Sequence, residues 1–295
     1  MKNISPKLND RGKDFLKSMC FLSPSLLGVG IFFILPFCVV VYYSLIDGVG
    51  SKNFVFLQNF IKLFDNYAFR LAAKNTLTFS AMAVPLAVVL SMVLALMLES
   101  RIPLKSQFRT FFLSPMMVPV ASVVLIWQVL FNYNGTVNEF IMLFGADKVD
   151  WLQSQFAPVV VLLLFLWKNL GYNMILFMAA LNNIPKELLE VADVEGASEM
   201  YKFFAIKLRY LSPTVLFVTI LSLINSFKVF REVYLLAGAY PYEALYTLQH
   251  FMNNTFDSLD YQKLSAAAVL MALVMVVIIA LLFKAEDWFG KDVEG

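Results

Sequence analysis

Six segments of the chain are each long and apolar enough to cross a lipid bilayer as a helix. They cover residues 18–45, 76–98, 110–131, 157–180, 213–236 and 264–283. A membrane-spanning helix needs about 20 mostly apolar residues, because the hydrocarbon core is about 30 Å thick. Of the 295 residues, 60% are hydrophobic and 15% are charged, whereas a soluble domain has about 45–50% and 25%. The sequence therefore predicts an all-α, polytopic membrane protein.

The composition also excludes several classes of function. The net charge of +2 provides no strongly basic surface, so we expect no nucleic-acid partner. The two cysteines, Cys20 and Cys38, are about 27 Å apart along one helix, which is too far for a disulfide. His250 is the only histidine. A metal centre built from several histidines is therefore excluded, and we expect no metal and no catalytic residue.

The lysine and arginine residues predict how the chain is oriented in the membrane. If the N-terminus is cytoplasmic, 14 of the 23 basic residues lie in inner segments, six lie in outer segments and three lie within spans. Cytoplasmic loops carry the excess of positive charge. We therefore expect a multi-pass protein of the bacterial plasma membrane with both termini cytoplasmic. Residues 1–17 and 285–295 are the tails, and 18–284 form the transmembrane domain.

One inner loop, residues 181–212, has a pronounced local pattern. Pro185 suits the first turn of a helix, and Glu190 is one of two acidic residues near its positive dipole end. Gly196 is placed to end that helix in a left-handed conformation, and Ser198 can cap a second helix. The pattern predicts two short amphipathic helices at a bend. They either lie on the lipid headgroups or dock another protein.

The residues of this loop carry a resemblance to a known family. Glu190-Val191-Ala192, followed by Gly196-Ala197, resembles the E-A-A-x-x-x-G loop of importer permeases of the ATP-binding-cassette (ABC) class. The flanking stretches "NNIPKELLEVA", "INSFKVFREVYLL" and "DYQKLSAAAVLMALV" are similar to the carbohydrate branch, the maltose and glycerol-phosphate permeases. The similarity extends from Leu22 to Leu282. Val191 and Arg209 depart from the pattern, since the family has alanine and proline there. Without that proline, the second helix is expected to continue toward Pro213.

The resemblance implies a fold, a role for the loop and a set of partners. The fold is the six-helix type I importer permease, and the loop is a coupling helix that fits a cleft on a cytoplasmic ATPase. The implied coupling residues are Glu190, Ala192, Gly196, Ala197, Phe203 and Phe204. The implied partners are a second, homologous permease subunit, two ATPase subunits and an extracellular solute-binding protein, all around a carbohydrate substrate and membrane lipid. The chain has no G-x-x-x-x-G-K-[ST] motif, so ATP is bound by the partner subunits and no cofactor is expected here.

Polar side chains at half depth in the fourth and fifth spans indicate where the solute passes. In "LWKNLGYN" the polar residues recur at helical spacing, and the fifth span carries a second polar stripe. Amides and hydroxyls suit a polyhydroxylated solute, because they donate and accept hydrogen bonds without fixed charge. The resemblance implies the same location. The predicted substrate-binding residues are Lys168, Asn169, Ser222, Asn225 and Ser226.

Several alternatives remain open at this stage. The polar stripes could serve only to join helices, as asparagine and serine often do in bundles. Lys168 has no acidic residue in its own span, whereas Lys228 and Glu232 are four residues apart and are expected to pair. The three cations within spans keep an anionic solute, such as glycerol phosphate or a uronide, as an alternative to a neutral sugar. An ion-coupled transporter and an intramembrane enzyme are the other two alternatives.

Overall fold

The described chain is helical almost throughout. A computed structural model describes residues 8–48, 50, 53–99 and 103–290, and among them an isolated antiparallel bridge between Ile46 and Phe54 is the only β structure. The helices are α1 (Leu8–Val29), α2 (Leu35–Ser44), α3 (Gln58–Asp65), α4 (Tyr67–Glu99), α5 (Lys105–Met117), α6 (Val120–Leu130), α7 (Thr136–Met142), α8 (Ala157–Asn182), α9 (Lys186–Val194), α10 (Glu199–Lys202), α11 (Leu208–Lys228), α12 (Phe230–Ala237), α13 (Leu248–Asp257) and α14 (Tyr261–Gly290). The predicted all-α class is confirmed.

Five of the helical segments are long and apolar enough to cross a membrane, and a bent pair makes a sixth if it is counted as one span. The five are Lys17–Ser44, Tyr67–Glu99, Ala157–Asn182, Glu199–Ala237 and Tyr261–Asp287. They overlap with five of the six predicted spans, and two of them, Tyr67–Glu99 and Glu199–Ala237, begin well before residues 76 and 213. Both predicted tails fall partly outside the described residues, at 1–7 and 291–295, while α1 and α14 extend into the rest of each tail.

The predicted third span, 110–131, is not one straight helix. α5 ends at Met117 and α6 begins at Val120, and the two axes differ by 100°. Val118 is extended (φ −88°, ψ 132°) because a residue that precedes a proline, here Pro119, is disfavoured in the helical region. Pro119 also lacks the N–H that would continue the helix. The sequence marked this position with a proline but did not predict the size of the bend.

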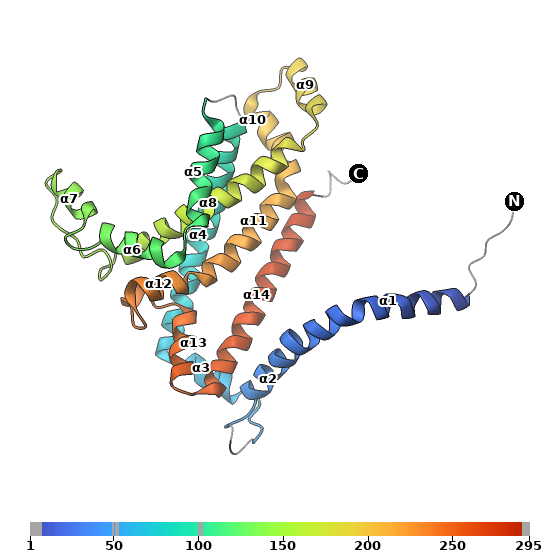
Figure 1. Ribbon diagram of the computed structural model, residues 1–295, viewed down its shortest axis with the longest axis vertical. Coiled ribbons are helices and arrows are strands. Elements are labelled where there is room, and N and C mark those ends of the chain that lie inside the picture. Colours follow the sequence, from blue (N-terminus) through green and yellow to red (C-terminus); the bar gives the residue numbers. More distant parts are fainter. Residues whose placement is uncertain (1–7, 49, 51–52, 100–102, 291–295) are drawn as a thin grey trace.

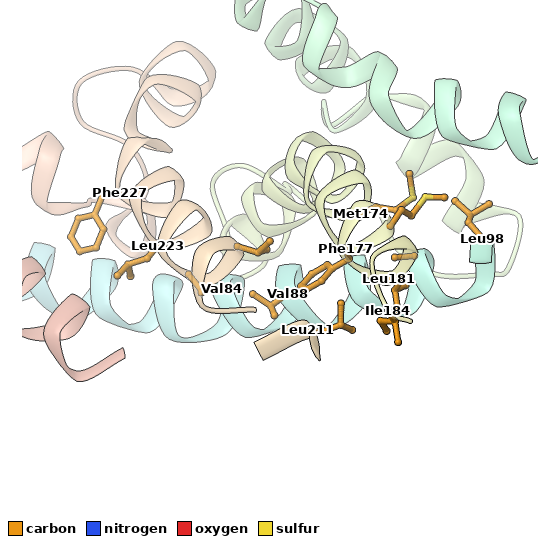
Figure 2. Close-up of a cluster of buried hydrophobic side chains, with 13 residues drawn as sticks. Val84, Val88, Leu98, Met174, Phe177, Leu181, Ile184, Leu211, Leu223 and Phe227 are labelled. Atoms are coloured by element: carbon orange, nitrogen blue, oxygen red, sulfur yellow. The ribbon is translucent and has the colours of Figure 1, made fainter. Parts of the chain in front are cut away.

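The apolar core is formed by α4, α8 and α11, which pack side by side with α14 against α11 (Figure 1). Figure 2 shows one cluster in this core, with side chains from three of these helices pointing toward one another. Its fully buried members include Met174 and Phe177 of α8 and Leu211 of α11. α5 crosses α8 at Gly171, where a Cβ atom would lie 1.8 Å from the carbonyl oxygen of Phe112. The absence of a side chain at Gly171 therefore permits this close crossing.

The first span stands apart from this core. α1 diverges from the other helices, and α2 packs against α14 (Figure 1). The most apolar part of this span has no buried residue, and Phe21, Phe32 and Phe33 are among its most exposed side chains. At the ends of the core, α9 and α10 lie opposite α3 and α13 (Figure 1). The predicted inner loop and two predicted outer segments thus occupy opposite ends of the molecule.

Candidate functional site

A large cavity lies between the core and the bent pair. It has a volume of about 860 Å³ and is bordered by α5, α6, α8, α11, α12 and Gln249 of α13. α8 and α11 each contribute one face: α8 presents residues 165, 168, 169 and 172, and α11 presents residues 221, 225 and 228, whereas most residues of α12 border the cavity. The spacings of three, four and seven residues put the side chains on one side of α8 and of α11. The bend at Pro119 contributes Pro115, Met116, Val118 and Val120 to the wall.

Two amides face one another across the cavity wall. The Asn225 amide nitrogen donates to the Asn169 side-chain oxygen at 2.9 Å, and the Asn169 nitrogen donates to the Phe165 carbonyl at 2.8 Å. Both asparagines line the cavity and are partly exposed to it. Tyr172 and Gln249 add a hydroxyl and a third amide to the lining. The wall therefore offers both donors and acceptors at neutral side chains.

Lys168 also lines the cavity, and it forms an ion pair with Glu232 of α12. The two side chains are 21% and 11% exposed. The expectation that Glu232 pairs with Lys228 is therefore wrong, and Lys168 does have an acidic partner, on a different helix. The two residues are 64 positions apart, so local spacing gave no signal for this contact. The pair joins α8 to α12.

Ser222 and Ser226 lie elsewhere than the prediction placed them. Both are buried, with exposures of 0% and 2%, and neither lines the cavity. Ser222 accepts a hydrogen bond from the Asn173 amide at 3.0 Å, and the Ser226 hydroxyl is 2.8 Å from the hydroxyl of Ser80. These contacts join α11 to α8 and to α4. For these two serines the helix-joining alternative describes the structure.

Sequence analysis did not identify Gln249 as a lining residue. It belongs to α13, in a segment that the hydropathy pattern assigns to an outer loop. Its position on the cavity depends on how α13 packs against α4 and α12. No feature of the local sequence distinguishes it. Arg231 and Lys228, which the sequence placed within a span, both border the cavity as well.

The loop at the opposite end of α8 has the predicted helix–glycine–helix form. α9 begins after Pro185 and is followed by Gly196 in the left-handed region (φ 77°). The Ala197 N–H donates to the Ala192 carbonyl at 2.9 Å, and Ser198 caps α10 by accepting from the Tyr201 N–H at 3.3 Å. The predicted helix ends are confirmed. The second helix also continues, as expected, and passes through Pro213 without a break as far as Lys228.

The loop is anchored to the core and exposes apolar side chains. Lys202 is buried among ion pairs with Asp193 and Glu199, and Lys207 pairs with Glu99 at the end of α4 at 2.8 Å. Its exposed apolar residues are Leu188, Val191, Val194, Met200, Tyr201 and Phe204. Among the predicted coupling residues, Glu190, Gly196 and Phe204 are exposed, Ala197 and Phe203 are half-buried, and Ala192 is buried.

Comparison with known proteins identifies the family. The profile described as "binding-protein-dependent transport system inner membrane component" matches residues 87–295. The chain belongs to this family. It is therefore a multi-pass permease subunit of a binding-protein-dependent ABC importer and is not itself an enzyme.

Named relatives and a solved structure agree with this membership. The chain is 27% identical to the lactose transport system permease protein LacF of Rhizobium radiobacter, over 89% of this chain and 91% of that one. It is 30% identical to the arabinooligosaccharides transport system permease protein AraP of Halalkalibacterium halodurans, over 68% and 67%. A bacterial alginate ABC transporter, solved in complex with an alginate pentasaccharide-bound periplasmic protein, has a chain that is 22% identical with a TM-score of 0.82. That match covers 97% of this chain and 99% of the other, and it supports the type I importer permease fold.

Proposed function

We propose that this permease subunit imports a carbohydrate through the cavity between α8 and the α11–α12 segment. The main evidence is the pair of amides, Asn169 and Asn225, on the wall of a cavity of about 860 Å³ between the membrane-spanning helices. Hydroxyl groups of a sugar can replace the hydrogen bond between these amides, because each amide both donates and accepts. The relatives named for lactose and arabinooligosaccharide transport support the same solute class.

Energy for import is proposed to enter through the loop 181–212. Its exposed apolar side chains, together with the exposed Glu190 and Phe204, offer a surface for a cytoplasmic ATPase subunit. Within the loop, the buried Lys202 pairs with Asp193 and Glu199 and so joins α9 to α10, while the Lys207–Glu99 pair joins the loop to α4. The loop also connects α8 to α11 along the chain. A displacement of the loop is therefore passed to the helices that border the cavity. Such a displacement can open the cavity alternately to the two sides of the membrane.

The remaining partners are proposed from the family to which the chain belongs. Two ATPase subunits and a second, homologous permease subunit would complete the importer, and an extracellular solute-binding protein would deliver the sugar. The first span exposes apolar side chains on every side, which suits contact with a second permease and with lipid. The orientation with both termini cytoplasmic follows from the distribution of lysine and arginine. It places the loop on the ATPase side.

The test of this function is uptake by the complete complex. We would reconstitute the permease with its partner permease, ATPases and solute-binding protein, and then offer a mixed oligosaccharide digest of plant and bacterial polysaccharides. Mass spectrometry would identify what enters, with and without ATP. Asn169→Leu and Asn225→Leu are each expected to lower uptake about five-fold or more, since a lost hydrogen bond to a desolvated solute costs about 1 kcal/mol.

The matched control is Ser226→Ala, one residue along α11 from Asn225. Ser226 bonds to Ser80 and does not line the cavity, so its variant is expected to retain uptake. Uptake that depends on an ion gradient and not on ATP would contradict the proposal. Wild-type uptake by both leucine variants would show that the solute path lies on the partner subunit.

A further inference from the structure

The cavity carries an unequal set of charges. Four charged side chains border it, and three of them are cations: Lys168, Lys228 and Arg231, against the single anion Glu232. Lys168 and Glu232 form an ion pair and compensate one another. Among the described residues, Lys228 and Arg231 form no ion pair within 4 Å. The lining therefore carries two positive charges without a counterion.

These two cations lie close to the amides of the wall. Lys228 is three residues after Asn225 on the same face of the helix, a rise of about 4.5 Å. Arg231 follows in the first turn of α12, directly after the break at Val229. Val229 is buried, whereas Lys228 and Arg231 are exposed, and all three residues border the cavity. The two amides and the two cations therefore border the same cavity.

A cation within a membrane-spanning segment is unfavourable unless water, a cavity or a negative group compensates it. Arginine presents a planar set of donors that matches a carboxylate, sulfate or phosphate, and lysine adds a compact charge. Neutral sugars need neither group, because amides and hydroxyls satisfy them fully. The pair of uncompensated cations is therefore better explained by a negatively charged ligand than by a neutral one.

We propose that the solute of this permease is an acidic carbohydrate. Its hydroxyl groups would bond to Asn169 and Asn225, and its oxyanion (carboxylate, sulfate or phosphate) would lie against Lys228 and Arg231. This inference rests on the proposed function, since it assigns a solute class to the same cavity. The competing reading is that both cations only extend to lipid headgroups.

The experiment divides the oligosaccharide digest by anion exchange into an acidic and a neutral fraction. Each fraction is offered to the reconstituted complex, and ATP-dependent uptake is measured. We expect the acidic fraction to supply the imported solute at a rate at least ten-fold above the neutral one. The double variant Lys228→Gln/Arg231→Gln is expected to lower uptake of that acidic solute ten-fold or more, through a higher half-saturating concentration. Lys228→Arg keeps the charge and is expected to retain most of the uptake.

The control variant is Lys62→Gln, an exposed lysine on α3 that does not line the cavity. Basal ATPase activity of each complex shows whether the double variant still folds and assembles. Import of neutral sugars alone overturns the acidic-solute inference and leaves the proposed function in place. Acidic uptake that the double variant leaves unchanged also overturns it, because anion recognition then lies on another subunit. ATP-dependent uptake of neither fraction overturns the proposed function itself.

Discussion

At the scale of single residues, the ion pair between Lys168 and Glu232 leads to a prediction about paired substitutions. Lys168→Gln leaves the Glu232 carboxylate without its partner at 11% exposure, and Glu232→Gln does the same to the lysine. Each single variant is expected to destabilise the protein by about 1.5–3 kcal/mol, the usual contribution of a hydrogen bond to a charged group. The double variant removes both charges and is expected to recover at least half of that loss.

Thermal unfolding of the solubilised permease complex measures this coupling, because the four proteins form a double-mutant cycle. Losses that simply add in the double variant would show that the two residues do not interact. The ion pair also limits what a single substitution at Lys168 can show about the solute. Loss of uptake in Lys168→Gln alone does not identify an anionic solute, because the substitution also leaves the Glu232 carboxylate without its ion-pair partner.

His250 leads to a second prediction at this scale, for the dependence of stability on pH. Burial lowers the pKa of His250 from 6.5 to about 4. Its ring packs 4.6 Å from the ring of Phe230, its Nδ1 contacts the Thr247 hydroxyl at 2.8 Å, and its Nε2 has no partner among the described residues. The unfolded chain binds a proton at higher pH than the folded one. The stability from neutral His250 is therefore present above pH 6.5 and is lost as the pH falls toward 4.

The variant His250→Gln tests this dependence. Glutamine cannot titrate, yet at this position it can keep the capping box that His250 forms with Thr247. The wild-type melting temperature is expected to fall more between pH 7.5 and pH 5 than that of the variant. The wild-type protein loses stability only between pH 6.5 and pH 5, an interval of 1.5 pH units. At 1.36 kcal/mol per unit, the resulting loss in the free energy of unfolding is at most about 2 kcal/mol. Equal pH dependence in both proteins would contradict the buried, neutral state.

At the scale of elements, the bend between α9 and α10 depends on the backbone of Gly196. A Cβ at this position would meet no atom within 4 Å, so there is room for a side chain. The left-handed φ of 77° is what restricts the residue type here. Gly196→Val should therefore strain the bend and abolish uptake, whereas Gly196→Asn should retain much of it, because asparagine tolerates this conformation. Uptake and ATPase co-purification measure the two effects. Normal transport by the valine variant would show that the loop has no part in coupling.

At the scale of the whole molecule, the orientation expected from the lysine and arginine residues predicts which segments are accessible from each side. In a background without Cys20 and Cys38, Leu143→Cys should react with an impermeant maleimide in intact cells. Met200→Cys should react only in inside-out vesicles washed free of peripheral proteins. Both positions are well exposed, at 81% and 69%, so access and not burial decides the result. The reverse pattern would show that the topology is inverted and that the loop cannot contact a cytoplasmic ATPase.

Much of this molecule could be predicted from short stretches of sequence. The span lengths follow from bilayer thickness, and the loop follows from Pro185, Gly196 and Ser198, whose effects act within one helical turn. The lining positions of Asn169 and Asn225 agree with helical periodicity in their own spans. These features depend on neighbours a few residues away, so local rules were sufficient for them.

The tertiary structure decided which polar groups meet. Asn225 and Ser226 are adjacent in sequence, yet one lines the cavity and the other bonds to Ser80 on α4. The partner of Lys168 was decided in the same way, since Glu232 belongs to α12 and meets Lys168 only through the packing of α8 and α12 at the cavity. The 100° bend after α5 places residues from both α5 and α6 on the cavity wall beside α8. Local sequence thus determines where helices form and end, because those energies are short-range. Packing between distant helices determines which face of each helix borders the cavity and which charged side chains line it.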